Sequence, residues 1–244
     1  MTSYDTIAAN IAHVRETIAA AFKRADRSPD DVTLLAISKT QSPEAILAAV
    51  AAGAQQFGEN RVEESRTKIP AVNEKSPVPL TWHMVGHIQS RKASEVPPLF
   101  QVVHSVDSVK LAAKLSRLVS EAGGGLDVFL EVNISGEASK QGFAAHRWQQ
   151  NRQVREQFWT AFGEILSLPG LNVRGLMTMA PIVDDMEEVR PVFRDLSALR
   201  AALAADLGVS LPDLSMGMTD DYPVAVEEGA TIVRVGRAIF GPRR

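Results

Sequence analysis

Eight short apolar segments recur along this chain, and stretches with helical periodicity separate them. Apolar runs of this length are too short for helices and are typical of strands buried on both faces of a parallel sheet. Alternation of such strands with helices predicts parallel pairing through right-handed crossovers. The candidate strands cover residues 33–38, 55–58, 81–86, 102–105, 127–134, 173–179, 213–218 and 231–236.

The segments between the strands carry helix signals. Ser42 as N-cap before Pro43 predicts one helix start, and Pro191 predicts the first turn of another. Before the first strand, apolar side chains at helical spacing predict an amphipathic helix over residues 5–26. Eight strand–helix units leave about 30 residues each, which favours a barrel over an open sheet. We predict an α/β fold: a single (β/α)8 TIM barrel spanning residues 1–244 as one domain, with an extra N-terminal helix.

Charge and composition exclude several classes of function. The chain carries 26 Lys and Arg against 29 Asp and Glu, a net charge of −3, so we expect no nucleic-acid partner. It has no Cys, which excludes thiolate nucleophiles and Cys-ligated zinc. The longest apolar stretch, residues 46–54, is far shorter than the roughly 20 residues of a membrane span. No signal-type segment opens the chain, so we expect a cytoplasmic protein without a membrane partner.

Two cations lie at the strand ends, where barrels of this kind place their chemistry. Lys39 ends the first candidate strand, and partial desolvation in a barrel mouth would lower the pKa of its amine and make it more nucleophilic. The alternative is a solvated loop lysine, since lysine is usually exposed. Arg234 is the one charge in the last candidate strand. It either serves a ligand or closes the barrel through an ion pair.

The segments that follow the last two strands have the composition of a phosphate site. Residues 215–219 combine Gly with the hydroxyls of Ser215 and Thr219, and Gly236 precedes Arg237. Phosphate sites in these barrels are often built from the loops after strands 7 and 8 and a helix N-terminus. Ordinary strand–turn–helix transitions contain the same residue types, so both interpretations stay open.

Three histidines, His83, His87 and His104, lie near the ends of the third and fourth candidate strands. Their spacing differs from that of two ligands on one helical face, so we predict no metal site. A lysine able to form an imine, a phosphate cradle and an arginine in one barrel mouth suggest pyridoxal 5′-phosphate (PLP), a phosphorylated aldehyde. A barrel that binds sugar phosphates is another interpretation, in which Lys39 binds an anion or a sugar carbonyl.

Longer segments from residue 33 to the end match one family in order: LLAISKTQSPEAI, FGENRVEE, WHMVGHIQSRK, HSVDS, LEVNISGEASKQGF, VRGLMTMAP, LSMGMTDD and EEGATIVRVGRAIFG. Together they resemble the pyridoxal phosphate homeostasis proteins, relatives of the N-terminal barrel of alanine racemase. The resemblance implies a barrel of that type. It also implies a set of cofactor-binding residues: Lys39, Asn60, His83, Ser215, Thr219, Arg234, Gly236 and Arg237.

The resemblance implies a role for each of these residues. Lys39 would hold PLP as a Schiff base, while Asn60 and His83 would line the pocket. The two loops after the last strands would receive the phosphate through the hydroxyls of the first loop and the backbone of the second. Arg234 would face the ring nitrogen. A cation there disfavours a protonated ring nitrogen and weakens the ring as an electron sink.

The chain departs from the family pattern at several positions. Gln41 stands where many members carry a second lysine, which casts doubt on a role of that position in cofactor transfer. Lys140 is a remaining candidate for such a role. Arg61 and Tyr222 also replace commoner residues. The segment over residues 146–159 is predicted to be helical and is longer and more basic than usual.

Two functions from different classes fit these residues. The first is a vitamin B6 cofactor carrier that binds, buffers and delivers PLP to apo PLP-dependent enzymes, without turnover and without catalytic residues. The alternative is a PLP-dependent racemase or decarboxylase of the fold-type III class. Racemisation needs a base on each face of the substrate. The chain has only two tyrosines, Tyr4 and Tyr222, and ends soon after the last strand. We therefore favour the carrier, and expect a monomer or a weak dimer.

Overall fold

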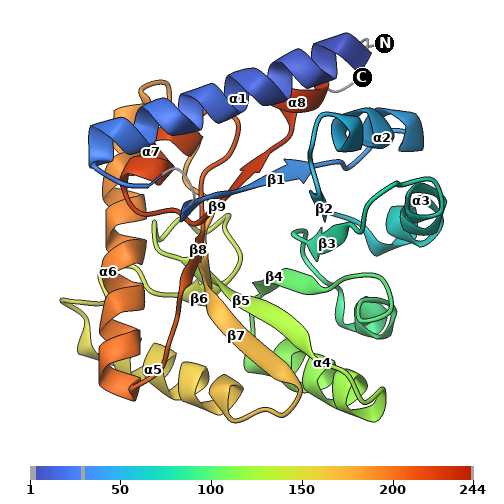
Figure 1. The fold of residues 1–244 in the computed structure, drawn as a ribbon. Coiled ribbons are helices and arrows are strands. Elements are labelled where there is room, and N and C mark those ends of the chain that lie inside the picture. The colour runs from blue at the N-terminus through green and yellow to red at the C-terminus, as the bar shows by residue number, and fades with distance from the viewer. Residues whose placement is uncertain (1–3, 29–30, 243–244) are drawn as a thin grey trace.

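The computed structural model describes residues 4–28 and 31–242. Eight parallel strands form a closed ring, because β1 pairs with both β2 and β9, and β4 pairs with β5 (Figure 1). The strands of the ring are β1 (Thr33–Ile37), β2 (Gln56–Glu59), β3 (Thr81–Met84), β4 (Val102–Val106), β5 (Leu126–Asn133), β7 (Leu171–Met177), β8 (Asp213–Ser215) and β9 (Ile232–Val235). The predicted (β/α)8 barrel is therefore confirmed.

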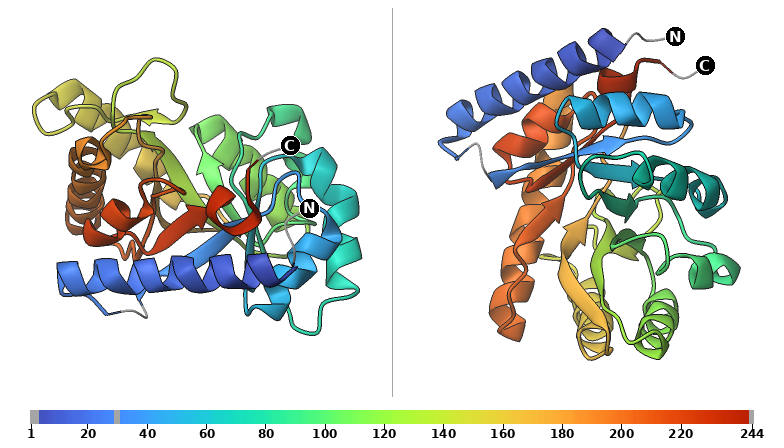
Figure 2. Two further views of the ribbon diagram at one scale, coloured as in Figure 1. Left: turned by 90° about the horizontal axis from the view of Figure 1, so that it is seen from above. Right: turned by 45° about the vertical axis from the view of Figure 1, so that its right-hand side comes forward.

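Helices follow the strands and form the outer layer of the barrel (Figure 2). Three of them begin at a polar side chain that accepts a hydrogen bond from the first turn, namely at Ser42, Ser108 and Asn151. The α-helices are α1 (Tyr4–Ala25), α2 (Pro43–Ala51), α3 (Val62–Asn73), α4 (Val109–Glu121), α5 (Arg152–Leu166), α6 (Arg190–Leu207), α7 (Tyr222–Glu227) and α8 (Arg237–Phe240). Two 3₁₀ helices, η2 (Ser90–Glu95) and η3 (Met186–Val189), complete the layer.

Two segments differ from the sequence prediction. Residues 146–151 form turns, and α5 begins only at Arg152. The indole of Trp148 donates to Asp195 on α6 at 2.9 Å, and Arg147 has a φ of +53°, so this segment is held in a turn against α6. The strand β6 (Phe143–Ala144) was not predicted, and it pairs with β5 outside the ring.

The apolar residues pack in two separate cores. Six buried side chains fill the interior of the barrel: Leu35, Ile37, Val102, Phe129, Met177 and Ile232. The larger core lies between the strands and the outer helices and includes residues from nearly every element. Because successive side chains of a strand point to opposite faces, the strands β1, β4, β5, β7 and β9 contribute to both cores, whereas β2, β3 and β8 contribute apolar side chains only to the larger core. This explains why the strands appear in the sequence as continuous apolar runs.

The N-terminal helix α1 closes the outer layer. It packs against α2, α7 and α8, across the top of the view in Figure 1. The helix that follows β9, α8, has only four residues, and α1 supplies the apolar surface that so short a helix cannot provide. Asn10 on α1 donates to the carbonyl of Ile239 on α8 at 2.9 Å. Although α1 has 22 residues, none of the helices that the structure describes is long and apolar enough to cross a membrane.

Stability of the barrel should therefore depend on α1. Ile11 is 1% exposed and faces the core, so Ile11→Ala should lower the free energy of unfolding by about 3 kcal/mol. Glu16 on the exposed face of the same helix provides a matched control, since Glu16→Ala should change it by at most about 0.5 kcal/mol. Urea unfolding followed by circular dichroism measures both values. Equal effects of the two substitutions would contradict a closing role of α1.

Candidate functional site

The eight predicted cofactor-binding residues lie on strands that are neighbours around the barrel. The neighbouring strands are, in order around the barrel, β8, β9, β1, β2 and β3 (Figure 1). Each of them carries at least one of the eight residues at its carboxyl end or in the loop that follows. Strands β1 and β9 pair Leu35 with Arg234. A Cβ built on Gly236 would lie 3.4 Å from the Cβ of Ile37, two residues before Lys39. The fold therefore gathers these residues at one side of the barrel mouth.

Arg234 is buried inside the barrel and bound on both of its terminal nitrogens. Nη1 donates to the carbonyl and the hydroxyl of Ser215 at 2.7 and 2.8 Å, and Nη2 donates to the carbonyl of Thr178 at 2.8 Å. Burial lowers the pKa of Arg234 to about 10, and the charges of Asp221 and Glu131 oppose that shift. The guanidinium therefore stays protonated at neutral pH. These bonds hold the cation in place without an ion pair to a contacting carboxylate.

A chain of hydrogen bonds continues from Ser215 through two histidines. Ser215 Oγ lies 2.8 Å from His104 Nδ1, His104 Nε2 lies 2.8 Å from His83 Nδ1, and His83 Nε2 lies 2.7 Å from Gln56 Oε1. Burial lowers the pKa of His83 to about 3 and that of His104 well below its usual value. Both rings are therefore neutral, and each donates one bond and accepts one.

The direction of this chain follows from its two ends. Gln56 Oε1 can only accept, so His83 donates to it from Nε2 and accepts from His104 at Nδ1. His104 must then accept at Nδ1 from the hydroxyl of Ser215. The oxygen of that hydroxyl in turn accepts from Arg234. The single proton of the Ser215 hydroxyl is therefore engaged beneath the barrel mouth. Its role as a phosphate ligand stays a prediction that the geometry does not favour.

The loops after β8 and β9 lie side by side at the mouth. The backbone N–H of Arg234 donates to the carbonyl of Gly217 at 2.9 Å, and the side chains of Arg237 and Asp220 form an ion pair. Thr219 and Gly236 are partly exposed and Arg237 is exposed, so these residues can be reached by a ligand. The predicted phosphate loops are thus adjacent in space, with donors available at their surface.

The loops after β2 and β3 meet on the other side of Lys39. A Cβ built on Gly86 would lie 2.2 Å from the carbonyl oxygen of Asn60, so only glycine fits at that contact. Asn60 and Lys39 are both partly exposed, whereas His83 lies deeper in the barrel and is 4% exposed. The structure therefore places Asn60 near the surface of the mouth and His83 in the hydrogen-bond chain below it.

Sequence reasoning missed two polar residues of the barrel interior. Gln56 ends the hydrogen-bond chain, and Glu131 on β5 is a carboxyl only 3% exposed. Burial raises the pKa of Glu131 to about 7, and the nearby charge of Asp107 adds to the shift while that of Arg234 opposes it. The position of Glu131 within the apolar run VFLEV could have drawn attention to it, as a charge within an apolar run did to Arg234. Within residues 4–28 and 31–242, no three His, Asp or Glu side chains group as metal ligands.

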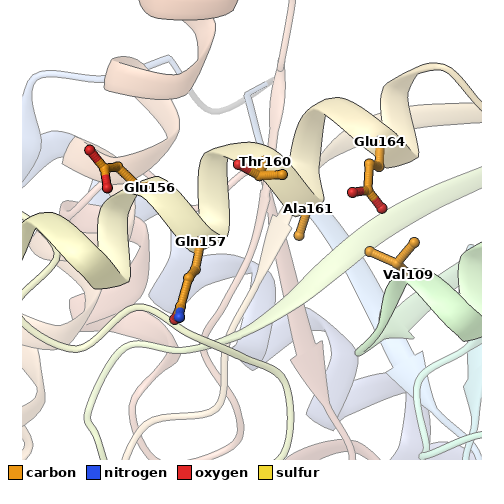
Figure 3. A pocket seen from close by; sticks show the side chains of 6 residues that line it. All are labelled: Val109, Glu156, Gln157, Thr160, Ala161 and Glu164. Atoms are coloured by element: carbon orange, nitrogen blue, oxygen red, sulfur yellow. The ribbon is translucent and has the colours of Figure 1, made fainter.

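A hollow on the outer surface is separate from this site. It has a volume of about 350 Å³ and is lined by Val109 at the start of α4 and by one side of α5 (Figure 3). The lining residues on α5 are Glu156, Gln157, Thr160, Ala161 and Glu164. None of the eight predicted residues borders it. The candidate site is therefore defined by the strand ends and not by this hollow.

Comparison with known proteins assigns the family. The model of the alanine racemase N-terminal domain matches residues 3–244. A Pseudomonas aeruginosa protein is 41% identical over 238 residues, covering 98% of this chain and 96% of its own. An Aquifex aeolicus protein is 37% identical over 234 residues, covering 96% and 97%. Both are named pyridoxal phosphate homeostasis protein. The chain belongs to this family.

A solved structure of the same fold extends the comparison. PipY of Synechococcus elongatus, determined with PLP bound, matches with a TM-score of 0.80 at 32% identity, covering 96% of this chain and 100% of its own. The resemblance drawn from the sequence segments, to the homeostasis proteins and the alanine racemase barrel, is therefore confirmed. The roles of the eight individual residues in this homeostasis family member stay predictions.

The raised pKa of Glu131 gives a measurable pH dependence. The pKa of Glu131 is about 7 in the folded chain and 4.5 in the unfolded chain, so the folded chain binds the extra proton between these values. The contribution of Glu131 to the free energy of unfolding is therefore complete below pH 4.5 and is lost as the pH rises through 7. The free energy of unfolding of the wild type, minus that of Glu131→Gln, should fall by about 2 kcal/mol between pH 5 and pH 7. Urea unfolding of both proteins at the two pH values measures this.

The comparison with Glu131→Gln is needed because His83 acts in the opposite direction. The pKa of His83 is about 3 in the folded chain and about 6.5 in the unfolded chain, so the unfolded chain binds the extra proton between these values. The contribution of His83 to the free energy of unfolding is therefore lost as the pH falls below about 6.5. This effect is present in both proteins and cancels in the difference. A difference that stays constant between the two pH values would show that Glu131 titrates normally.

Proposed function

We propose that this chain, as one domain over residues 1–244, binds PLP through a Schiff base with Lys39 and holds it for intracellular PLP homeostasis. The observation that carries the proposal is the position of Lys39 just past the carboxyl end of β1, the strand that pairs with β9 and its buried cation Arg234. The names of relatives at 37–41% identity and the PLP-bound structure of PipY support the choice of cofactor. When bound, PLP supplies an aldehyde, a phosphate and a ring nitrogen.

The groups at the barrel mouth fit these three features. Lys39 supplies the amine, and the loops after β8 and β9 supply the Thr219 hydroxyl and the backbone N–H groups of Gly236 and Arg237. Arg234 supplies a fixed cation below the mouth and would face the ring nitrogen. A cation there disfavours protonation of the ring nitrogen. The ring nitrogen therefore stays neutral, and the ring withdraws electrons weakly. This arrangement favours retention of the cofactor over chemistry on a bound amino acid.

The same geometry supports a carrier without substrate turnover. His83 and His104 are buried, neutral and bonded in a chain, so neither is free to move a proton to a substrate. We propose that the chain buffers PLP in the cytoplasm, delivers it to apo PLP-dependent enzymes, and acts as a monomer or weak dimer.

Glu131, with a pKa of about 7, is the observation that favours the alternative of a racemase or decarboxylase, because a group of that pKa can act as an acid or base.

Lys39→Ala tests the proposed attachment of PLP. The wild type should show an imine absorbance band that borohydride bleaches, and Lys39→Ala should lack the band because no amine occupies that position. Lys110, an exposed lysine on α4, provides the control, since Lys110→Ala should keep the band. Absorbance spectra with added PLP measure this. A wild type without a band at saturating PLP would disprove the proposal.

A second measurement separates the carrier from the enzyme. We expect no racemisation or decarboxylation of common amino acids by the PLP-loaded wild type at an enzyme-like rate, measured by chiral chromatography. We also expect Arg234→Ala to release PLP faster than Lys92→Ala, because Lys92 is engaged in ion pairs with Glu63 and Glu95 and is not one of the predicted cofactor-binding residues. Steady turnover that Glu131→Gln abolishes would instead support the alternative function.

A further inference from the structure

A buried ionic cluster lies behind the turn that carries Lys39. It consists of Ser38 at the end of β1, Glu59 at the end of β2, and Glu64 and Lys68 on α3, and we call it the α3 clamp. Glu59 is fully buried and the side chain of Lys68 is 6% exposed. Lys68 Nζ lies 3.1 Å from both carboxylate oxygens of Glu59 and also pairs with Glu64. The two buried charges therefore satisfy each other.

The α3 clamp binds the backbone on both sides of Lys39. On one side, Lys68 donates to the carbonyl of Ser38 at 3.0 Å, and the Ser38 hydroxyl donates to Glu59 at 2.6 Å. On the other side, the backbone N–H of Thr40 donates to the Glu64 carboxylate at 2.7 Å. Three contacts from two neighbouring elements, β2 and α3, thus fix the residues directly before and after Lys39.

The turn needs this support because Thr40 has an unfavourable backbone conformation. Its φ is +64°, in the left-handed region that β-branched residues rarely occupy. Such conformations persist when the surrounding structure holds them, and they occur often at ligand sites. Two contacts hold this one: the bond from Thr40 N–H to Glu64, and the turn bond from the N–H of Gln41 to the carbonyl of Ser38 at 3.0 Å.

Stability alone does not account for the cluster. Burial raises the pKa of Glu59, while the charge of Lys68 and the hydroxyl of Ser38 lower it in part. Taking two such charges out of water is unfavourable, and apolar replacements of buried ion pairs are often neutral or stabilising. Specific placement of a backbone segment is a role that an apolar replacement cannot fill, because it offers no donor to Ser38 and no acceptor to Thr40.

We propose that the α3 clamp positions Lys39, so that Glu64 and Lys68 are positioning residues for Schiff-base formation without contacting the cofactor. The inference rests on the function proposed above. In the covalent step, the neutral Nζ of Lys39 forms a C=N bond to the aldehyde carbon. The carbonyl oxygen leaves with the two amine protons as one water, so no oxidant or reductant is needed. The clamp acts on this step alone, by holding the turn in the conformation that presents the amine.

The experiment compares two ligands that differ only in the reacting group. PLP carries the aldehyde, whereas pyridoxine 5′-phosphate carries an alcohol and cannot form a Schiff base. Glu64→Ala removes the acceptor for Thr40 N–H, and its side chain is 27% exposed, so the chain should still fold. We expect it to bind PLP about tenfold more weakly, which corresponds to about 1.4 kcal/mol, and to bind pyridoxine 5′-phosphate as the wild type does.

Three further variants complete the design. Glu63→Ala is the matched control, because Glu63 precedes Glu64 on α3 but pairs with Lys92 outside the α3 clamp. It should bind both ligands normally. Glu64→Gln keeps an oxygen that accepts from Thr40 N–H and should restore most of the PLP affinity. Lys68→Met should resemble Glu64→Ala in its ligand preference, with thermal unfolding recorded to verify that it folds.

Borohydride reduction followed by mass spectrometry provides an independent readout. At equal PLP occupancy, the fraction of pyridoxyl label on Lys39 should be lower in Glu64→Ala than in the wild type. Wild-type PLP affinity in Glu64→Ala would overturn the inference, as would equal weakening of both ligands, which would indicate general damage to the pocket. If the wild type itself forms no Schiff base, or Lys39→Ala forms it equally well, the proposed function fails and the inference about the clamp falls with it. A Schiff base on Lys39 that Glu64→Ala leaves unchanged contradicts the inference alone.

Discussion

The buried guanidinium of Arg234 is the constraint around which the barrel interior is arranged. A cation inside an apolar barrel must keep its hydrogen bonds, because an unpaired buried charge is strongly unfavourable. The carbonyls of Thr178 and Ser215 turn toward it from β7 and β8, and the hydroxyl of Ser215 completes the set. Burial keeps the adjoining His83 and His104 neutral, and the positive charge of Arg234 adds to the effect on His104. The dry interior of the barrel thus sets the protonation of both rings.

This arrangement also separates the interior from the mouth. Below, each residue of the chain from Arg234 to Gln56 is hydrogen-bonded to the next. Above, Thr219, Arg237 and Asn60 retain exposed surface on loops. The lower layer is suited to a fixed electrostatic field, and the upper layer to a ligand that enters and leaves. A carrier needs both properties, because it must hold its cofactor and also release it.

The sequence predicted the barrel because its strands are buried on both faces and appear as apolar runs. Arg234 could be found in the same way, as a single charge within TIVRVG. Lys68 could not be found, because it stands among Glu and Arg in VEESRTKIPAVN and looks like part of a solvated helix face. Its burial depends on Glu59 from another strand, which no local pattern reveals. The turn over residues 146–151 escaped prediction for a similar reason, since Trp148 is held by Asp195 on a distant helix.

The closure of the outer layer by α1 and α8 has a consequence for the order of folding. The helix α1 packs against α2, which follows it closely, but also against α7 and α8, and the bond from Asn10 to Ile239 joins residues 229 positions apart. The strand β1 likewise completes its pairing only with β9. Until α7 and α8 have been synthesised, the apolar face of α1 lacks two of its three partners. Contacts between such distant residues slow folding, so the outer layer around α1 closes late.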